Sequence, residues 1–520
     1  MMKKLGICVV LILCGALAFM IWLKRKPGRE TALRGLVSDL GLRVSPGELG
    51  ARRFGPAPEP DVGEAPNVLI IAFDNVRADR MSCYGGPRPT TPNLDALAER
   101  GTRFVRCVAQ APYTPHSFAS MLSSLYVSDL EVRMRARVSD GNEIKRAGLE
   151  LYNLSIAEVM REAGYATAAV VHGWFTEAFG LLQGFDWVSY ERRLLPAGID
   201  TTLEWLRQWQ EIYSDRPFFL LSYSDDVHYE FMRGRGPDDH IFGARHDGFN
   251  FSGEILREFR KGKLVPSEDD IRNAFTLYDE GLYWADHEIQ RLLDGLDEMG
   301  LRDTTIIVFV SDHGEEFNEH GILSHGQSNF ATVVDVPLII VDPRYEGGKV
   351  AQERVMNIDV MPTLLDLCGI PVPETAKGSS LAPLVRGEPQ PELEGRHIFS
   401  EGAWNGFVGA VWAGRYKYLM GKDGDRYLFD LEADPNEARN LAEELPDLTG
   451  RLEEMFFRHK RDGLATQILL KLEAPLTLNR IALPDPKLLG DVSSAVKSDD
   501  ARPTLSEGSI EQLKALGYLE

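Results

Sequence analysis

The side chains with the clearest potential for chemistry follow an apolar run at residues 306–310. They are Asp312 and His313, with His320 and His325 a short way further along the chain. Carboxylates and imidazoles are common ligands of divalent metal ions, so this stretch predicts a metal site. The alternative is an ordinary polar loop, in which the aspartate caps the backbone and the histidines face water.

The same pattern recurs at two other apolar runs. Residues 68–73 are followed by Asp74 and Asn75, and residues 218–223 lead to His228. Apolar runs of this length without alternation are typical of strands buried on both faces of a parallel sheet. Since ligands bind beyond the carboxyl ends of such strands, we expect the polar side chains after the three runs to meet at one edge.

A candidate nucleophile is Thr114, which precedes Pro115 at the expected start of a helix. Amide groups and the dipole at a helix N-terminus stabilise anions, so a hydroxyl there could attack an anionic ester. Threonine followed by proline is also a common pair at a helix N-cap, where the hydroxyl only caps the backbone. The spacing alone leaves both interpretations open.

Strands and helices alternate through the centre of the chain. Helical patterns occupy residues 93–100, 155–163, 202–209, 277–299 and 361–367, and further strand patterns occupy residues 165–171 and 336–341. This alternation predicts an α/β fold with a mostly parallel central sheet and helices on both of its faces.

The pattern changes after about residue 387. Two neighbouring strands are expected at residues 415–420 and 426–430, followed by a helix at 445–457. We therefore assign residues 67–387 to the main domain and residues 388–470 to a small α+β C-terminal subdomain. Residues 471–520 are assigned to a polar tail with a short helix near residues 510–516.

The N-terminal region carries 19 uncharged, mostly apolar residues at positions 5–23. As a helix this segment could cross the hydrocarbon layer of a bilayer, which is about 30 Å thick. Its bulky end and the basic residues 24–26 favour a retained anchor over a cleaved signal peptide. We expect an anchor over residues 1–27 and a stalk over residues 28–66. The flanking charges by themselves lean toward a cytoplasmic body.

Composition narrows the class of protein further. A formal net charge of −21 argues against a nucleic-acid partner, because that binding needs basic residues to neutralise phosphates. Hydrophobic residues make up 44% of the 520 positions, enough for a large core. Cys83, Cys107 and Cys368 are an odd, scattered trio that predicts no disulfide framework.

Seven short motifs stand in order along the chain: DNVRAD at residues 74–79, CYG at 83–85, TTPNLDAL at 90–97, ASML at 119–122, SDHG at 311–314, DVMPTLL at 359–365 and DLEADP at 430–435. Together they resemble the sulfatase family of the alkaline phosphatase superfamily, over about residues 67–445. The resemblance implies an alkaline phosphatase-like fold and a metal-dependent hydrolase of sulfate or phosphate esters.

The resemblance also implies roles for individual residues. Those that match metal-ligand positions are Asp74, Asn75, Asp312 and His313. The residues that match the nucleophile and the substrate-contacting positions are Thr114, His228 and His325.

The nucleophile motif departs from the family pattern. Sulfatases in the strict sense carry Cys or Ser in C-x-P-x-R, which is converted to formylglycine, whereas residues 114–118 read TPHSF. Formylglycine chemistry is therefore excluded at Thr114. Relatives that keep threonine use it directly as an alkoxide on phosphate esters or head groups, and His116 and Phe118 break their usual pattern too.

Two alternatives to the hydrolase follow from these departures. One is a head-group transferase of the phosphoglycerol or phosphoethanolamine type. The other is a membrane-tethered binding protein that kept the fold and lost catalysis.

A site that includes His313 mixes nitrogen with oxygen ligands, which suits Mn²⁺ or Zn²⁺ better than Ca²⁺. The resemblance leaves Ca²⁺ open, because relatives with oxygen-only ligands use it. It also favours export of the body to the outer face of a membrane, against the flanking charges, because long domains cross largely regardless of such charges.

Overall fold

A computed structural model describes residues 65–130, 136–137, 143–144, 149, 153–172, 175, 180–190, 195–229, 231, 239–244, 251–402 and 407–473. All of these residues belong to one compact unit, Pro56–Glu520. The expected anchor at residues 5–23, most of the stalk, the polar tail after residue 473 and its helix near 510–516 lie outside the described residues. Within the described part of the chain, no helix is both long and apolar enough to cross a membrane.

The main sheet has eight strands in the order β12-β2-β11-β8-β1-β7-β5-β6. At its centre, β1 (Asn67–Phe73) lies between β8 (Thr305–Ser311) and β7 (Phe218–Ser224). The outer strands are β5 (Ala166–Val171), β6 (Trp187–Tyr190), β11 (Asp335–Val341), β2 (Thr102–Val108) and β12 (Lys349–Met356). The mostly parallel sheet predicted from the sequence is confirmed.

One strand runs against the others. β11 pairs antiparallel with both β8 and β2, whereas the pairs β1–β7, β1–β8, β5–β7, β5–β6 and β2–β12 are parallel. Because β11 is buried between two neighbours, its sequence is as uniformly apolar as that of the parallel strands. The apolar pattern therefore indicated burial of this strand and not its direction.

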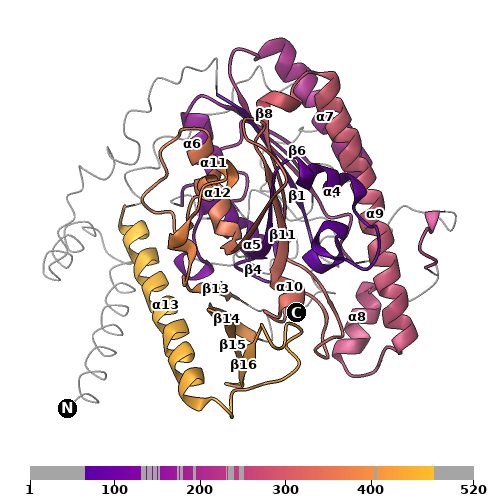
Figure 1. Cartoon of the computed structure of the whole chain (residues 1–520), viewed down its shortest axis with the longest axis vertical. Coiled ribbons are helices and arrows are strands. Elements are labelled where there is room, and N and C mark those ends of the chain that lie inside the picture. Colours follow the sequence, from indigo (N-terminus) through magenta and orange to yellow (C-terminus); the bar gives the residue numbers. More distant parts are fainter. Residues whose placement is uncertain are drawn as a thin grey trace, which may run out of the picture. The chain divides into compact units, whose positions relative to one another are not determined.

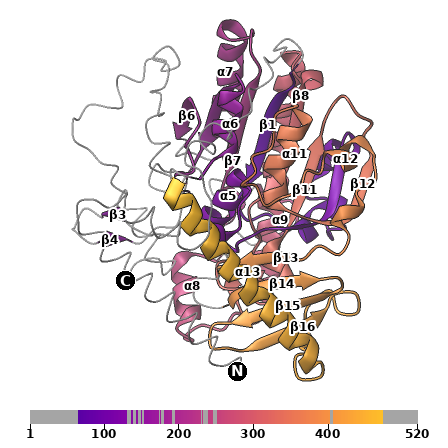
Figure 2. The ribbon, with the colours of Figure 1, turned by 90° about the vertical axis from the view of Figure 1, so that its left-hand side faces the viewer.

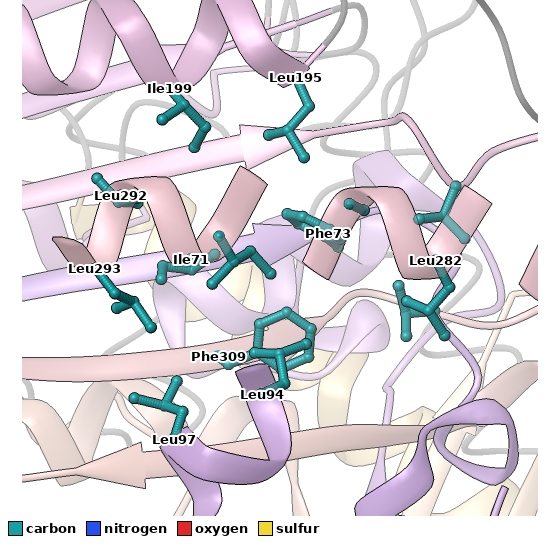
Figure 3. Close-up of a cluster of buried hydrophobic side chains, with 14 of the residues drawn as sticks. Ile71, Phe73, Leu94, Leu97, Leu195, Ile199, Leu282, Leu292, Leu293 and Phe309 are labelled. Carbon is teal, nitrogen blue, oxygen red and sulfur yellow. The ribbon is translucent and has the colours of Figure 1, made fainter. Parts of the chain in front are cut away.

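The central strands are covered on both faces, and every residue of β1, β7 and β8 is buried. Successive side chains of a strand point to opposite faces, so Ile71 and Phe73 of β1 lie on the same face as Phe309 of β8. Figure 3 shows these three side chains together with leucines and an isoleucine from helices packed on that face. The rings of Phe73 and Phe309 meet edge to face, with centroids 5.7 Å apart.

Two layers of helices enclose the sheet (Figure 1). The helices that pack on the face with Phe73 are α4 (Pro92–Glu99), α7 (Leu195–Ile212) and α9 (Glu268–Glu298). The helices on the other face include α5 (Thr114–Ser123), α6 (Ile156–Glu162), α11 (Val360–Leu367) and α12 (Ala382–Arg386). Shorter elements are α8 (Gly253–Arg260), α10 (Ala331–Val334) and the strand pairs β3–β4 (Ala136–Arg137, Glu143–Ile144) and β9–β10 (Glu316–Phe317, Leu323–Ser324).

The longest helix of the described residues, α9, starts earlier than its apolar pattern predicted. Its N-cap Ser267 accepts a hydrogen bond from the amide of Asp270, whose carboxylate bonds back to the Ser267 amide. This capping box satisfies two of the free amides of the first turn, and three acidic residues there complement the helix dipole. The helix can therefore begin several residues before its apolar stripe.

The C-terminal region forms a separate four-stranded antiparallel sheet, β13-β14-β15-β16. Its strands are β13 (Ile398–Glu401), β14 (Phe407–Ala413), β15 (Tyr416–Gly421) and β16 (Arg426–Asp430). Helix α13 (Pro446–Glu473) lies across this sheet (Figure 2), and Leu452 and Phe456 pack against Val411, Tyr418 and Leu428. The expected α+β subdomain is present, and its helix is longer than predicted.

A buried carboxylate ties α13 to the edge of the small sheet. Glu401, at the end of β13, accepts hydrogen bonds from Lys460 (2.5 Å) and Ser128 (2.9 Å) and contacts the imidazole of His459 (2.7 Å). Burial alone would raise its pKa, but the hydrogen bond with His459 and the positive charge of Lys460 outweigh burial and lower the pKa from 4.5 to about 2.

We predict that Glu401→Gln lowers the free energy of unfolding by about 3 kcal/mol at pH 7, because a pKa depressed in the folded state stabilises that state. The stabilisation is fully present above the unfolded pKa of 4.5 and is lost as the pH falls toward the folded value of about 2. Urea unfolding at pH 7 and pH 3 measures the difference between wild type and variant at each pH.

The control is Glu454→Gln on the same helix, which removes an exposed ion pair with Arg458. Such pairs contribute little, so its effect should stay below about 0.5 kcal/mol. The difference in unfolding free energy between wild type and Glu401→Gln should be smaller at pH 3 than at pH 7. An equal difference at both pH values would contradict the lowered pKa of Glu401.

Candidate active site

The central strands deliver the predicted metal ligands to one edge of the sheet. Asp74 follows β1 and Asp312 follows β8, and these two strands are parallel neighbours whose last residues, Phe73 and Ser311, are in register. The backbone amides of both aspartates continue the ladder, since Asp74 N donates to Ser224 O and Asp312 N donates to Phe73 O. The carboxylates are therefore held by rigid strands at the carboxyl edge, where ligands bind in such sheets.

Asp74, Asp312 and His313 form a buried cluster. One ligand atom from each side chain lies within 4.8 Å of the other two. His313 Nε2 is 3.3 Å from Asp74 Oδ1 and 3.5 Å from Asp312 Oδ2. This is the one group of at least three such side chains found among the described residues.

Each carboxylate has one oxygen bound by the protein and one without a hydrogen-bond partner. Asp74 Oδ2 accepts from the hydroxyls of Tyr223 (2.7 Å) and Thr114 (3.2 Å), while Asp74 Oδ1 accepts none. Asp312 Oδ1 accepts from the amides of Asn75 (3.2 Å) and His313 (2.8 Å), while Asp312 Oδ2 accepts none. A buried anionic oxygen without a partner is costly unless a cation binds it.

The tautomer of His313 is fixed by its own loop. Its Nδ1 lies 3.0 Å from the carbonyl oxygen of Gly314, which can only accept, so Nδ1 carries the hydrogen. Nε2 then presents a lone pair toward the two free carboxylate oxygens. A backbone carbonyl behind a metal-binding imidazole is a common means of orienting the ring.

Asn75 adds a further oxygen to this set. Its side-chain NH₂ donates to Glu315 Oε2 at 2.7 Å, and its Oδ1 is buried without a hydrogen-bond partner. The four predicted ligand residues therefore lie together. The atoms that they can offer are three oxygens without a hydrogen-bond partner and the Nε2 of His313, which lies 3.2 Å from the Thr114 hydroxyl. That donor set fits a divalent metal ion.

The electrostatics of the pocket fit a cation as well. Burial, followed by the charge of Asp312, raises the pKa of Asp74 to about 8. Burial also raises the pKa of Asp312 to about 7 and that of Glu315 to about 8. A bound cation would favour the ionised form of all three carboxyl groups.

Thr114 lies directly beside this cluster. Its Oγ1 is 3.2 Å from Asp74 Oδ2 and 3.2 Å from His313 Nε2. Thr114 is the first residue of α5, and Tyr113 is the N-cap, with no side-chain capping bond. The alternative interpretation, in which the Thr114 hydroxyl only caps the helix, is therefore wrong.

The orientation of α5 is fixed by a second hydroxyl on the same face. Ser117, one turn after Thr114, donates to the carbonyl oxygen of Asp312 at 2.6 Å. All ten residues of α5 are buried. The Thr114 hydroxyl is therefore held at the N-terminus of a rigid helix that is bonded to the metal-ligand loop.

The two departures from the family pattern lie away from the free ligand atoms. His116 Nε2 is 2.9 Å from the Tyr113 hydroxyl, and burial lowers the pKa of His116 to about 3. Phe118 packs edge to face on Phe175 and Tyr223, with ring centroids 4.7 and 5.2 Å apart. Through Tyr223, this aromatic cluster supports Asp74.

The two predicted substrate-contacting histidines are neighbours. The ring of His325 lies 4.9 Å from that of His228 and 4.4 Å from that of His313. His325 Nδ1 is 3.1 Å from Glu315 Oε1. Burial, then the nearby charges of His313 and Arg260, hold the pKa of His325 well below its usual value.

His320 does not join the site. Its Nδ1 contacts Glu316 at 3.0 Å, its Nε2 contacts the carbonyl oxygen of Asn436 at 3.2 Å, and its ring stacks on Phe330. It links the β9–β10 hairpin to the C-terminal region. The expectation that it would lie with Asp312 and His313 is wrong, because these contacts hold its ring in the turn between β9 and β10.

Two residues around the ligands were missed by sequence reasoning. Tyr223, the sixth residue of β7, supplies a hydrogen bond to Asp74, and Glu315 contacts both Asn75 and His325. Glu315 directly follows the motif SDHG, so an acidic residue beside two proposed ligands was a usable signal. Tyr223 gave no such signal, because it lies in an apolar run that predicts a buried strand.

Comparisons with known proteins identify the family of the chain. The model of the family described as Sulfatase matches residues 66–370, and one described as N-sulphoglucosamine sulphohydrolase, C-terminal, matches residues 319–460. An arylsulfatase of Clostridium perfringens is 26% identical over 456 residues, covering 72% of this chain and 90% of that protein. A choline-sulfatase of Rhizobium meliloti is 26% identical over 436 residues, covering 73% of this chain and 82% of that protein.

The solved structure of a phosphonate monoester hydrolase from Silicibacter pomeroyi shares the fold. Its TM-score is 0.59 at 21% identity, with 78% of this chain and 96% of that chain covered. The alkaline phosphatase-like fold class implied by the motifs is thus confirmed. The chain belongs to the sulfatase family, and its enzyme class is that of the sulfuric and phosphoric ester hydrolases.

Proposed function

We propose that this protein is a metal-dependent hydrolase of sulfate or phosphate esters in which the Thr114 hydroxyl is the nucleophile. The observation that carries the proposal is the position of Thr114 Oγ1, which lies 3.2 Å from both Asp74 Oδ2 and His313 Nε2 at the start of α5. A nucleophile beside metal ligands and a helix N-terminus is suited to attack on an anionic ester.

The reaction would proceed in two displacements. Thr114 Oγ1 forms a bond to the sulfur or phosphorus atom, its proton passes to Asp74 Oδ2, and the bond to the leaving oxygen breaks. The leaving oxygen takes a proton from His228, and His325, whose ring lies beside that of His228, contacts the bound ester. Water then attacks the sulfur or phosphorus atom and gives a proton to His228, the bond to Thr114 Oγ1 breaks, and Thr114 Oγ1 takes back the proton from Asp74 as sulfate or phosphate leaves.

Asp74, Asn75, Asp312 and His313 would hold the metal ion. When bound, the ion would neutralise charge on the ester oxygens and favour the deprotonated threonine. The nitrogen of His313 among oxygen ligands favours Mn²⁺ or Zn²⁺ over Ca²⁺. Tyr223 and the backbone amides of Asn75 and His313 fix the carboxylates in the orientation that leaves one oxygen of each free.

The first prediction from this proposal concerns Thr114. Thr114→Ala should reduce turnover of an aryl phosphate or aryl sulfate at least about 1,000-fold, because it removes the attacking oxygen. Thr114→Ser keeps a hydroxyl at the helix start and should retain measurable turnover. Purified variants are assayed with each ester in the presence of Mn²⁺ and of Zn²⁺, after their metal content has been matched.

Undiminished turnover by Thr114→Ala would remove Thr114 from the mechanism. No turnover of any ester by the wild type, with metal bound, would instead favour a binding protein that has lost catalysis.

A second prediction concerns the metal. Protein purified without chelator should contain Mn or Zn by elemental analysis, and Asp312→Ala should reduce that content to background, because it removes the carboxylate between Asn75 and His313. The control Asp303→Ala removes an exposed carboxylate paired with Arg100 and should leave the content unchanged. Retention of the metal by Asp312→Ala would contradict the assigned ligand set.

We also propose that residues 5–23 anchor the protein in a membrane with its body on the outer face. The apolar length of the segment and the export that the family resemblance implies support this arrangement. Lipid head groups and surface glycans would then be the available esters.

The location is tested with a reporter fused after Glu520 in a bacterial host. A periplasm-active phosphatase should be active in the fusion, and removal of residues 1–27 should abolish that activity by keeping the body in the cytoplasm. Activity of a cytoplasm-only reporter at the same position would overturn the arrangement.

A further inference from the structure

Glu315 is a buried carboxyl group that the proposed reaction does not use directly. It is fully buried, and three hydrogen bonds hold the backbone of residues 314 and 315. Its amide donates to Thr332 O at 3.1 Å, the preceding Gly314 amide donates to Val333 O at 2.6 Å, and Arg77 Nη1 donates to its carbonyl oxygen at 2.9 Å. A Cβ at Gly314 would meet Thr332 O at 2.4 Å, so glycine is needed for this close approach. The Glu315 side chain therefore extends from a fixed point.

The two carboxylate oxygens of Glu315 contact two residues that have different proposed roles. Oε2 accepts from the side-chain NH₂ of Asn75 at 2.7 Å, and Oε1 lies 3.1 Å from His325 Nδ1. Asn75 belongs to the proposed metal ligands and His325 to the proposed substrate contacts. Glu315 is thus a single bridge between the metal-binding half of the site and the substrate-binding half.

The bridge decides which end of the Asn75 amide faces the ligand cluster. The Asn75 backbone is already fixed, because its amide donates to Asp312 Oδ1 and its carbonyl accepts from the Tyr278 hydroxyl. Its φ of 72° lies in the left-handed region, which asparagine tolerates better than most residues. The remaining freedom is rotation of the amide. With NH₂ on Glu315, the oxygen faces away from Glu315 and stays free.

The same bridge decides the tautomer of His325. A cation in the ligand cluster favours the ionised form of Glu315, and an ionised carboxylate only accepts, so in the metal-bound protein its contact with Nδ1 places the imidazole hydrogen on that atom. Nε2 then keeps its lone pair, in a ring that lies between those of His313 and His228. The backbone beside it is anchored, since Gly326 N donates to Pro112 O at 2.9 Å.

We propose that Glu315 is a positioning residue that orients the Asn75 oxygen toward the metal and holds His325 in its Nδ1–H tautomer. The inference rests on the proposed function. It adds a residue that orients both a proposed metal ligand, Asn75, and a proposed substrate-contacting residue, His325.

The next residue provides a matched control. Glu316 is also fully buried, but its oxygens contact His320 at 3.0 Å and Ser328 at 3.2 Å, outside the ligand cluster. Both Glu315→Gln and Glu316→Gln replace a buried carboxylate by an amide of nearly the same shape. A merely structural role would give the two variants similar properties.

The test is calorimetric titration of metal-free protein with Mn²⁺ and with Zn²⁺, together with ¹⁵N NMR of histidine-labelled protein loaded with Zn²⁺, which is diamagnetic. In Glu315→Gln the new amide can accept from Asn75 only if its NH₂ faces His325, which moves the imidazole hydrogen to Nε2. In the opposite orientation two NH₂ groups face each other and the Asn75 oxygen is displaced. We expect either the Nε2–H tautomer of His325 or a 10–100-fold loss of metal affinity, with neither change in Glu316→Gln.

A double variant separates action through Asn75 from a general loss of stability. If Glu315 acts on the metal through Asn75, the affinity lost on Glu315→Gln should be absent when the change is made in Asn75→Ala. Glu315→Asp keeps the carboxylate on a shorter side chain. It should fold like the wild type and show an intermediate affinity, so the test holds even where the amide variant unfolds.

The outcomes distinguish the inference from the proposed function. A wild type that binds neither metal would overturn the proposed function, and the inference with it. A wild type that binds metal, with Glu315→Gln unchanged in metal affinity and in the His325 tautomer, would overturn only the inference. Equal effects of Glu315→Gln and Glu316→Gln would also overturn it.

Discussion

The structure depends on one electrostatic constraint, the burial of several carboxyl groups within a few ångströms of one another. Asp74 and Asp312 lie at the ends of adjacent strands, and the side chains of both are almost completely buried. Isolated buried anions are strongly disfavoured, and the protein leaves Asp74 Oδ1 and Asp312 Oδ2 without a hydrogen-bond partner. The rest of the site can be understood as the means of keeping these oxygens in place for a cation.

Rigid elements hold that arrangement from several directions. The pairing of β1 with β8 sets the spacing of the two aspartates, and Ser117 of α5 bonds to the Asp312 backbone at 2.6 Å. The same helix carries Thr114, so the proposed nucleophile and the proposed metal ligands are positioned by one packed unit. Sites on strands and helix ends are held more precisely than sites on free loops, which suits a reaction that needs defined geometry.

Much of this could be predicted from the sequence for a physical reason. Strands buried on both faces are uniformly apolar, so the runs before Asp74 and Asp312 were recognisable, and the polar residues after them were expected at one edge. The direction of β11 and the existence of β2 were not predicted. β11 is as apolar as a parallel strand, and β2 has a mixed pattern in which Arg103 and Arg106 are not buried.

The missed site residues share another cause. Tyr223 and Glu315 act through contacts with residues far away in the sequence, such as the pairs Tyr223–Asp74 and Glu315–Asn75. Spacing along the chain carries no signal for such contacts. His320 is the opposite example. It is a possible metal ligand close to Asp312 in the sequence, but it contacts Glu316 and Asn436 and lies outside the site.

His116 and Phe118, which depart from the family's nucleophile motif, both have defined contacts in the structure. His116 is satisfied by Tyr113, and Phe118 belongs to an aromatic cluster that includes the hydrogen-bond donor of Asp74. Both residues that depart from the family pattern are thus part of the buried interior around Thr114.

If Thr114 is the nucleophile, it forms a covalent ester with the transferred group during turnover, and rapid-quench mass spectrometry can detect that ester. Metal-loaded protein is mixed with an aryl phosphate or aryl sulfate, quenched in acid during the first turnover and digested. We expect a mass increase of one phosphoryl or sulfuryl group on the peptide that contains Thr114, located at that residue. Turnover of the ester with the label on another residue, or with no labelled peptide at any quench time, would contradict it.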